Sequence, residues 1–273
     1  MNEERIKLLA HWITEREKIR VLKESGAPQP WTQDHILANF RFCNVRREDD
    51  KVTRWIAANW RLPYRFSPNL TAAMVLARLL NNPDTLAKVG FPDEWNHKKI
   101  LAGIDHQRNG YGKWLNPAYV VTTCGVAMDK AEYIVNLATA VQEDELSPVM
   151  GDTLEYFHGK LMQFKGLGTF MAAQVIADLK NTPGNPLSSA LDFMTWAAVG
   201  PGSLRGLRYV TGVPDLPTGQ FLTVAQNLYA QVKDLIELPP IHMQDFQNCL
   251  CEFSKYWKAH AGIGQPKQRY PSR

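Results

Sequence analysis

The sequence predicts an all-α fold with about ten or more helices. Apolar residues recur at helical spacing along almost the whole chain. Strand-like runs are few, and the clearest of them, residues 118–123, would suit a helix equally well. Stretches rich in proline and glycine at 181–188, 200–206 and 212–219 are typical of the loops that join such helices.

The individual helices follow from apolar spacing and from residues that start or stop helices. The first is expected over residues 6–22 and ends at Ser25-Gly26, ahead of two prolines. The helix over 129–140 begins at an aspartate, a residue that commonly caps helices. The last has an apolar stripe over 243–257. Further helices are expected at 34–42, from residue 49, and at 71–80.

The composition is that of an ordinary globular protein of 273 residues, 45% hydrophobic and 21% charged. We expect one helical domain over residues 1–262, or two lobes that share a core, and a flexible basic tail at 263–273. The net charge of +4 is compatible with a polyanionic partner but does not require one. No signal-peptide pattern or membrane-spanning apolar run occurs, so we expect a soluble cytoplasmic protein.

The four cysteines and seven histidines lack the spacing of metal ligands. There is no Cys-x-x-Cys pair, and Cys249 and Cys251 point to different sides of a helix. The motifs His-x-His and His-Glu-x-x-His are also absent. We therefore expect buried, reduced thiols and no metal, and we assign no cofactor.

Residues 161–175 carry the pattern that bears most directly on function. Apolar residues surround Gly166-Leu167-Gly168, and a small residue, Ala172, follows in the second half. The pattern resembles the helix-hairpin-helix of DNA glycosylases and related DNA-binding proteins, and it implies a DNA-glycosylase-like helical fold. We expect helices at 158–166 and 169–179, so that the hairpin spans 158–179.

In such a hairpin the glycines let the backbone approach a phosphate, and the second helix offers it unsatisfied N–H groups. The expected DNA contacts are Lys165, Gly166, Gly168 and Thr169. An ordinary glycine-containing turn between two core helices is the alternative interpretation.

In the glycosylases, an aspartate at the mouth of the base pocket follows the hairpin. The matching residue here is Asp192, 24 positions after Gly168. A carboxylate at this place can act as a base or stabilise positive charge, and the alternative is a helix N-cap. Phe170 stands where bifunctional glycosylases have a Schiff-base lysine, so no lyase reaction is expected. Asp178, within a helix, is expected to pair with a cation.

Three other blocks, at 40–55, 198–208 and 248–256, resemble a narrower phage and bacterial group. This group comprises the alpha-glutamyl/putrescinyl thymine pyrophosphorylases and the helical domain of 5-hydroxymethyluracil DNA kinases. The resemblance implies a step in thymine hypermodification, inside the infected bacterial cell if the chain is phage-encoded. An amino acid or polyamine would displace the phosphate or pyrophosphate of 5-phosphomethyluracil in DNA. Because no Gly-Lys-Ser/Thr loop occurs, we expect the transferase rather than the kinase.

The chemistry assigns candidate roles to residues of these blocks. The leaving phosphate requires cationic and N–H groups, the amine requires a base, and the flipped pyrimidine requires a pocket. The candidates for phosphate binding are Arg46, Arg47, Arg54, Gly202, Ser203, Arg205 and Arg208. The candidates for catalysis are Asp192, Asn44, Asp49 and Glu252, and those for the base pocket are Trp196, Lys255 and Tyr256. The alternatives are a solvated helix face for the arginines and core packing for the last helix.

Two other functions share these features. A base-excising monofunctional DNA glycosylase would use the same hairpin and Asp192 with water in place of the amine. A non-catalytic DNA-binding module would need the hairpin alone. The cationic blocks outside the hairpin favour phosphate displacement. The expected partners are double-stranded or locally flipped DNA and the amine co-substrate, with no membrane.

Overall fold

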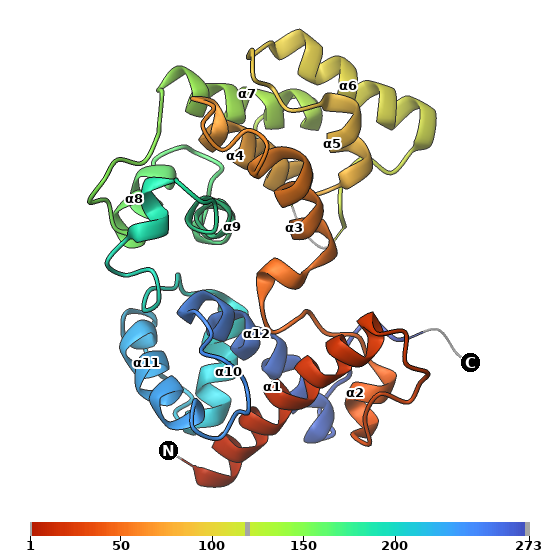
Figure 1. The fold of residues 1–273 in the computed structure, drawn as a ribbon, viewed down its shortest axis with the longest axis vertical. Coiled ribbons are helices and arrows are strands. Elements are labelled where there is room, and N and C mark those ends of the chain that lie inside the picture. The colour runs from red at the N-terminus through yellow and green to blue at the C-terminus, as the bar shows by residue number, and fades with distance from the viewer. Residues whose placement is uncertain (1, 118–120, 271–273) are drawn as a thin grey trace. The chain divides into compact units, whose positions relative to one another are not determined.

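The computed structural model describes residues 2–117 and 121–270 (Figure 1). This part of the chain contains twelve α-helices and no strand, apart from an isolated bridge between Phe40 and Arg269. The all-α prediction is confirmed. Residues 118–120 of the strand-like segment lie outside the described residues, and 121–123 are irregular.

The chain divides into two compact units. The terminal unit combines Met1–Asp50 with Met194–Arg273, and the middle unit is Lys51–Phe193. Each unit has its own set of buried apolar side chains.

Helix α1 (Glu3–Glu24) is the longest element of the terminal unit and packs against α10, α11 and α12. It ends with Ser25 as its C-cap, and Gly26 follows at φ +75°, as the sequence predicts. The other elements of this unit are α2 (His35–Asn39), the 3₁₀ turn η1 (Arg47–Asp49), α10 (Pro201–Thr211), the 3₁₀ turn η4 (Thr218–Gln220), α11 (Phe221–Val232) and α12 (Met243–His260).

Helices α10 and α12 approach each other closely because of two glycines. A Cβ atom on Gly206 would overlap the backbone carbonyl of Leu250, and one on Gly202 would overlap the sulfur of Cys251. The prediction that residues 200–206 form a loop is therefore wrong. Pro201 occupies the first helical position, where its missing N–H costs nothing, and the glycines serve helix packing.

The segment after residue 262, expected to be a loose tail, is paired with α2 as far as it is described. The N–H of Arg41 donates to the carbonyl of Gln268 (2.9 Å), and the N–H of Tyr270 donates to the carbonyl of Asn39 (3.0 Å). This pairing also explains why α2 ends at Asn39, before the predicted residue 42, since Phe40 already has extended backbone.

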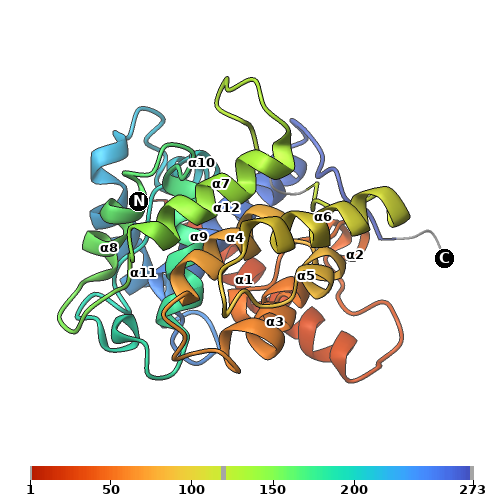
Figure 2. The ribbon, with the colours of Figure 1, turned by 90° about the horizontal axis from the view of Figure 1, so that it is seen from above.

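The middle unit contains the remaining helices. They are α3 (Lys51–Ile56), the π-helical turn η2 (Ala57–Arg61), α4 (Leu70–Leu80), α5 (Pro83–Val89), α6 (His97–Tyr111), α7 (Lys130–Glu143), α8 (Leu154–Leu161), α9 (Thr169–Lys180) and the 3₁₀ turn η3 (Pro186–Ser189). All eleven residues of α4 are buried, and this helix packs against α7 and α9 (Figures 1 and 2). The middle unit is thus built around α4.

A buried ion pair joins α4 to α9. Both carboxylate oxygens of Asp178 accept hydrogen bonds from Arg78, and Arg61 lies 3.5 Å from the same carboxylate. Asp178 is fully buried, so an unpaired charge there would be strongly destabilising. The prediction that Asp178 pairs with a cation is confirmed, and its role is structural.

Candidate functional site

The block at residues 42–50 of the terminal unit is held by Arg16 of α1. The Nε of Arg16 donates to the carbonyls of Phe42 (3.3 Å) and Cys43 (3.0 Å), and its Nη2 donates to the Oδ1 of Asn44 (2.5 Å). Only 8% of Arg16 is exposed. A guanidinium has five rigidly placed donors, so one side chain can fix three successive residues of an irregular segment.

The amide of Asn44 links this segment to the turn η1. Its Nδ2 donates to the carbonyl of Asp49 (2.9 Å), and its Oδ1 accepts from Arg16, while the main-chain carbonyl of Asn44 accepts from the Nδ2 of Asn248 (3.3 Å). Its N–H donates to the carboxylate of Asp50 (3.3 Å). Because both ends of the amide are used within the protein, Asn44 is placed to position η1 rather than to bind a ligand.

Arg46 and Asp49 take part in an ion-pair network with α1. The buried carboxylate of Glu17 accepts from Arg20 (2.6 Å) and Arg46 (3.2 Å). Arg20 also lies 3.3 Å from the carboxylate of Asp49. The hydrogen bonds that Arg20 donates to Glu17 raise the pKa of Arg20 above its ordinary value, against the effect of burial. Arg46 is thus neutralised by Glu17 and carries less free charge for a phosphate than the sequence suggests.

A cationic face forms where α10, α12 and the 42–50 block meet. We define it by Arg47, Arg205 and Lys255. Burial raises the pKa of the Cys251 thiol and the charge of Glu252 raises it further, whereas Lys255, Arg205 and Arg47 act in the opposite direction. All three cations therefore lie close enough to one sulfur to act on it electrostatically, although they are far apart in sequence.

Glu252 and Lys255 form a pair on α12 within this face. Glu252 is buried, and its carboxylate accepts hydrogen bonds from the ammonium of Lys255 and from the N–H of Cys43 (3.2 Å). The side chain of Lys255 is half exposed. Burial lowers the pKa of Lys255, but the charge and hydrogen bond of Glu252 raise it more, so the ammonium stays protonated.

Other predicted phosphate ligands of this unit are engaged elsewhere. The Ser203 hydroxyl is buried, donates to the carbonyl of Gly200 (3.0 Å) and accepts from Gln247 (3.0 Å). Gly202 faces Cys251 inside the α10–α12 contact. Arg208 donates twice to the carbonyl of Leu216 (3.2 and 2.7 Å). Sequence proximity to Arg205 therefore does not place Gly202 and Ser203 on the cationic face, whereas the bonds of Arg208 fix its guanidinium without neutralising it.

The predicted base-pocket aromatics are buried. Trp196 is 4% exposed and Tyr256 is 2% exposed. The hydroxyl of Tyr256 donates to the carboxylate of Asp34 (2.7 Å), and burial followed by this bond raises the pKa of the phenol. Neither ring is open to a nucleobase in this structure, so the core alternative holds for Tyr256.

The middle unit contains the predicted hairpin, with α8 and α9 on either side of Gly166-Leu167-Gly168. Helix α9 starts at Thr169 as predicted, whereas the first helix lies at 154–161 rather than 158–166. Turns fill residues 162–166 because Gly166 has a φ of +119°, which a helix cannot contain.

The two hairpin glycines have different surroundings. A Cβ atom on Gly166 would overlap the hydroxyl of Tyr133 and crowd Leu137, so this glycine is required for packing against α7. A Cβ atom on Gly168 would meet nothing within 4 Å. Gly168 is the N-cap of α9 and has no side chain of its own to cap that helix. The space beside Gly168, where the N–H groups of α9 begin, is therefore open.

A hollow of about 500 Å³ lies in front of these N–H groups. Its lining includes the 164–168 segment together with the exposed Phe170 and Cys124. Lys165 is exposed, and its charge acts on Cys124, whose pKa is lowered chiefly by hydrogen bonds from Tyr133 and Thr122. A helix N-terminus with a nearby lysine suits an anion.

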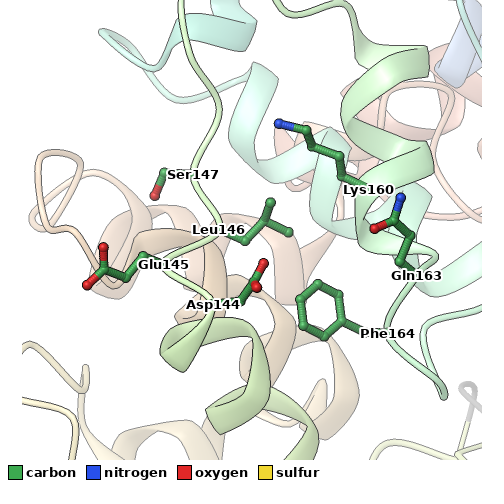
Figure 3. A pocket seen from close by; sticks show the side chains of 7 residues that line it. All are labelled: Asp144, Glu145, Leu146, Ser147, Lys160, Gln163 and Phe164. Atoms are coloured by element: carbon green, nitrogen blue, oxygen red, sulfur yellow. The ribbon is translucent and has the colours of Figure 1, made fainter.

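A second hollow of the middle unit, of about 470 Å³, lies between the loop after α7 and the end of α8 (Figure 3). Asp144, Glu145 and Lys160 line it, together with Phe164 of the hairpin. Two carboxylates against one ammonium make this hollow a poor place for a DNA phosphate. The hollow beside α9 is the better candidate.

Asp192 lies in a turn and binds the N-terminus of α8. Its two carboxylate oxygens accept from the N–H groups of Leu154 (2.7 Å) and Glu155 (3.0 Å). The capping alternative is therefore realised, but on α8, since residues 191–195 form no helix of their own. A catalytic role for Asp192 stays a prediction. Arg54, the last predicted phosphate ligand, is exposed on α3.

Sequence reasoning missed Arg16, Glu17 and Asp245, three buried charged residues of the terminal unit. Asp245 accepts from the N–H of Arg47 (3.0 Å) and so anchors η1 from α12. The sequence contains only a weak indication of these buried charges. The apolar stripe of α1 continues at helical spacing through charged residues, namely from Ile13 to Arg16, Glu17 and Arg20. Charged residues on the inner face of a helix indicate a buried polar network.

No cysteine is oxidised within the described residues, and only Cys249 is fully buried, whereas Cys43 and Cys124 are exposed. In the same part of the chain, no three histidine, cysteine or acidic side chains gather to hold a metal ion. Nor does any described helix have the length and apolar character needed to cross a membrane.

Known proteins now provide a comparison for this geometry. Over residues 3–265 the chain matches the family described as 5-hmdU DNA kinase, helical domain. The chain belongs to this family. The resemblance to the kinase helical domain is thereby confirmed, whereas membership of the thymine pyrophosphorylases stays a prediction.

One curated relative is the 5-hmdU DNA kinase of Bacillus phage SP10. It is 25% identical over 293 aligned residues, which cover 91% of this chain and 44% of the phage protein. The chain thus spans less than half the length of that relative. No solved structure matches the chain.

Proposed function

We propose that this chain modifies a 5-substituted uracil base in DNA, by replacing the phosphate or pyrophosphate of 5-phosphomethyluracil with an amine. The observation that carries the proposal is the cationic face of Arg47, Arg205 and Lys255 on η1, α10 and α12, where α12 contacts both other elements, in a chain of the 5-hmdU DNA kinase helical family. Since the sequence has no Gly-Lys-Ser/Thr loop for a phosphate donor, the face suits a phosphate that leaves.

DNA binding is assigned to the hairpin of the middle unit. The position of Gly168 at the N-terminus of α9, the open space beside this glycine and the exposed Lys165 support this assignment. Such contacts hold the phosphate backbone without reading the sequence. The base would have to leave the stack for its exocyclic carbon to react.

The reaction exchanges one bond at the exocyclic carbon. The C–O bond to the phosphate breaks, and the oxygen leaves with the electron pair, helped by electrons pushed from the uracil ring. The amine nitrogen then forms the new C–N bond and gives up one proton to a base. The protein has to stabilise the departing anion and exclude water from the reactive methylene.

We assign the leaving phosphate to Arg47, Arg205 and Lys255. Glu252 holds the ammonium of Lys255 in place, and Asn44 is a positioning residue that holds η1, and with it Arg47. Asp49 is the candidate base for the amine, because its carboxylate lies on the same turn and is partly exposed. An amino acid or a polyamine would be the co-substrate.

A second candidate function follows from the greater length of the phage kinase, of which this chain matches only a part. The matched part is less than half of a phage kinase, so the helical part could recognise the modified base for a kinase. In that case the chain would bind 5-hydroxymethyluracil DNA without changing it. A base-excising glycosylase is the third outcome that an assay has to distinguish.

The test is transfer of a radiolabelled amine to DNA that contains 5-phosphomethyluracil. Wild-type protein should label the DNA, and Arg47→Gln should label it about 10²-fold more slowly, as for the loss of one donor to a developing anion. Arg41→Gln is the matched control, because Arg41 is an exposed arginine of the same segment that stacks on Tyr270 instead. Equal rates for Arg47→Gln and wild type would contradict the assignment.

A further inference from the structure

The terminal unit has a pocket whose lining is cationic and aromatic. It has a volume of about 270 Å³ and brings together Arg5 of α1, Arg205, Arg208 and Tyr209 of α10, and Trp257 of α12. Gly212, at the end of α10, has a φ of +75° and turns the chain so that the following loop closes one side.

Two of the arginines are fixed by bonds that leave their charge intact. The Nη1 of Arg5 donates to the carbonyl of Tyr209 (2.7 Å), and its guanidinium lies 5.1 Å from the centre of the Trp257 ring. Arg208 donates to the carbonyl of Leu216. A carbonyl carries only a partial charge and an aromatic face only a quadrupole, so neither neutralises a guanidinium as a carboxylate would.

No acidic residue of the described part of the chain lines this pocket. Within the described residues, none of Arg5, Arg205 and Arg208 forms an ion pair with a carboxylate. The contrast is the network on the same α1, where Arg46 pairs with Glu17, and Arg20 pairs with Glu17, Glu24 and Asp49. Three like charges around one hollow repel one another, and a bound anion relieves that repulsion.

The structural hydrogen bonds of Arg5 and Arg208 explain only part of this arrangement. Bonds to the carbonyls of Tyr209 and Leu216 account for Arg5 and Arg208 as structural residues. They do not account for Arg205, which is exposed and lines the same pocket. The aromatic side chains of Tyr209 and Trp257 are not needed for these hydrogen bonds, whereas they suit a ligand with a flat ring.

We propose that the pocket of Arg5, Arg205, Arg208, Tyr209 and Trp257 binds a phosphate group that carries a nucleoside. The three guanidinium groups recognise the phosphate, and the volume exceeds what a single phosphate needs, which leaves room for the attached nucleoside. The phosphate can belong to a free nucleotide or to a DNA strand. This inference goes beyond the proposed transfer reaction, with which it shares only Arg205, and it holds whether or not that reaction occurs.

The test is isothermal titration calorimetry of the full chain with three probes: inorganic phosphate, thymidine 5′-monophosphate and a short single-stranded oligothymidylate. Wild-type protein should bind at least one of the two nucleoside phosphates more tightly than inorganic phosphate, and binding should weaken with salt. Arg5→Gln and Arg205→Gln should each weaken binding about tenfold or more. Arg205→Gln removes no hydrogen bond that fixes the fold, so it stays informative if Arg5→Gln unfolds.

The matched control is Arg65→Gln in the middle unit. Arg65 also donates to a carbonyl, that of Leu62 (3.1 Å), and stacks on an aromatic ring, that of Phe66 (4.5 Å), but it lies outside the pocket. A loss confined to the mononucleotide identifies a free nucleotide, and a loss confined to the oligonucleotide identifies a DNA strand. Either result supports the site. Failure of both nucleoside phosphates to bind, or equal binding by Arg205→Gln and wild type, overturns it.

Discussion

Replacement of Gly168 by valine should weaken DNA binding by the hairpin without destabilising its fold. Gly168 has a φ of −74° and a ψ of 172°, a conformation that any residue adopts. A Cβ atom there would meet nothing within 4 Å. We therefore expect the free energy of unfolding to change by no more than about 0.5 kcal/mol, as for most surface substitutions.

DNA affinity should fall, because the valine side chain occupies the space through which a phosphate would reach the first N–H groups of α9. Loss of one hydrogen bond to a charged group costs about 1.5–3 kcal/mol, or roughly 10- to 150-fold in Kd. The assay is fluorescence anisotropy with two duplexes of unrelated sequence at several salt concentrations. Both duplexes should lose affinity by the same factor, since backbone contacts do not read sequence.

Gly166→Ala is the contrasting variant. Its φ of +119° strains any side chain, and the added Cβ would overlap the hydroxyl of Tyr133. We expect a loss of about 1–3 kcal/mol in the free energy of unfolding, measured by chemical denaturation. The reasoning is refuted if Gly168→Val binds both duplexes with wild-type affinity, or if it unfolds as readily as Gly166→Ala.

Three further predictions concern stability. Asp192→Ala removes the carboxylate that binds two N–H groups at the start of α8, beside the Thr153 cap, and should cost about 0.5–2 kcal/mol in a urea titration, whereas no change would show that these bonds are dispensable. Gly206→Ala inserts a methyl group against the carbonyl of Leu250 and should cost about 1–3 kcal/mol by the same method, whereas an unchanged midpoint would contradict the close α10–α12 contact. Burial raises the pKa of Asp34, but hydrogen bonds from Tyr256 and from backbone N–H groups lower it more, to a net value below the ordinary one. Its stabilising effect is thus present above the unfolded pKa of about 3.9 and is lost as the pH falls through the lower folded pKa. Asp34→Asn should therefore lose part of this pH dependence in acid-unfolding curves, and an identical curve would count against the pair.

Most helices could be predicted because their signals are local. The stripe of α1, the capping aspartate before α7 and the left-handed Asn81 after α4 all lie within a few residues of the boundary that they specify. Helix α10 was missed because its signals are not local. The glycines at 202 and 206 reflect contact with a helix about forty residues away, and composition alone makes them resemble a loop.

The candidate site likewise combines residues that local sequence signals identify with residues that such signals miss. The motif around Asn44 drew attention to residues 42–50, since a polar amide in an apolar run needs partners. The partners themselves, Arg16 and Asp245, lie on other helices, and no spacing within the motif identifies them. At Tyr256 the sequence suggested a ligand contact for the polar group. In the structure the hydroxyl instead donates to Asp34, more than two hundred residues away.

The central claim is replacement of a phosphate by an amine on a thymine-derived base. The most direct test is the mass of the nucleosides released from 5-phosphomethyluracil DNA after incubation with the protein and a mixture of amino acids and polyamines. The account predicts a nucleoside that has lost the phosphate and gained the mass of one amine. Recovery of only the phosphorylated nucleoside, or of a free base with an abasic site, would contradict it.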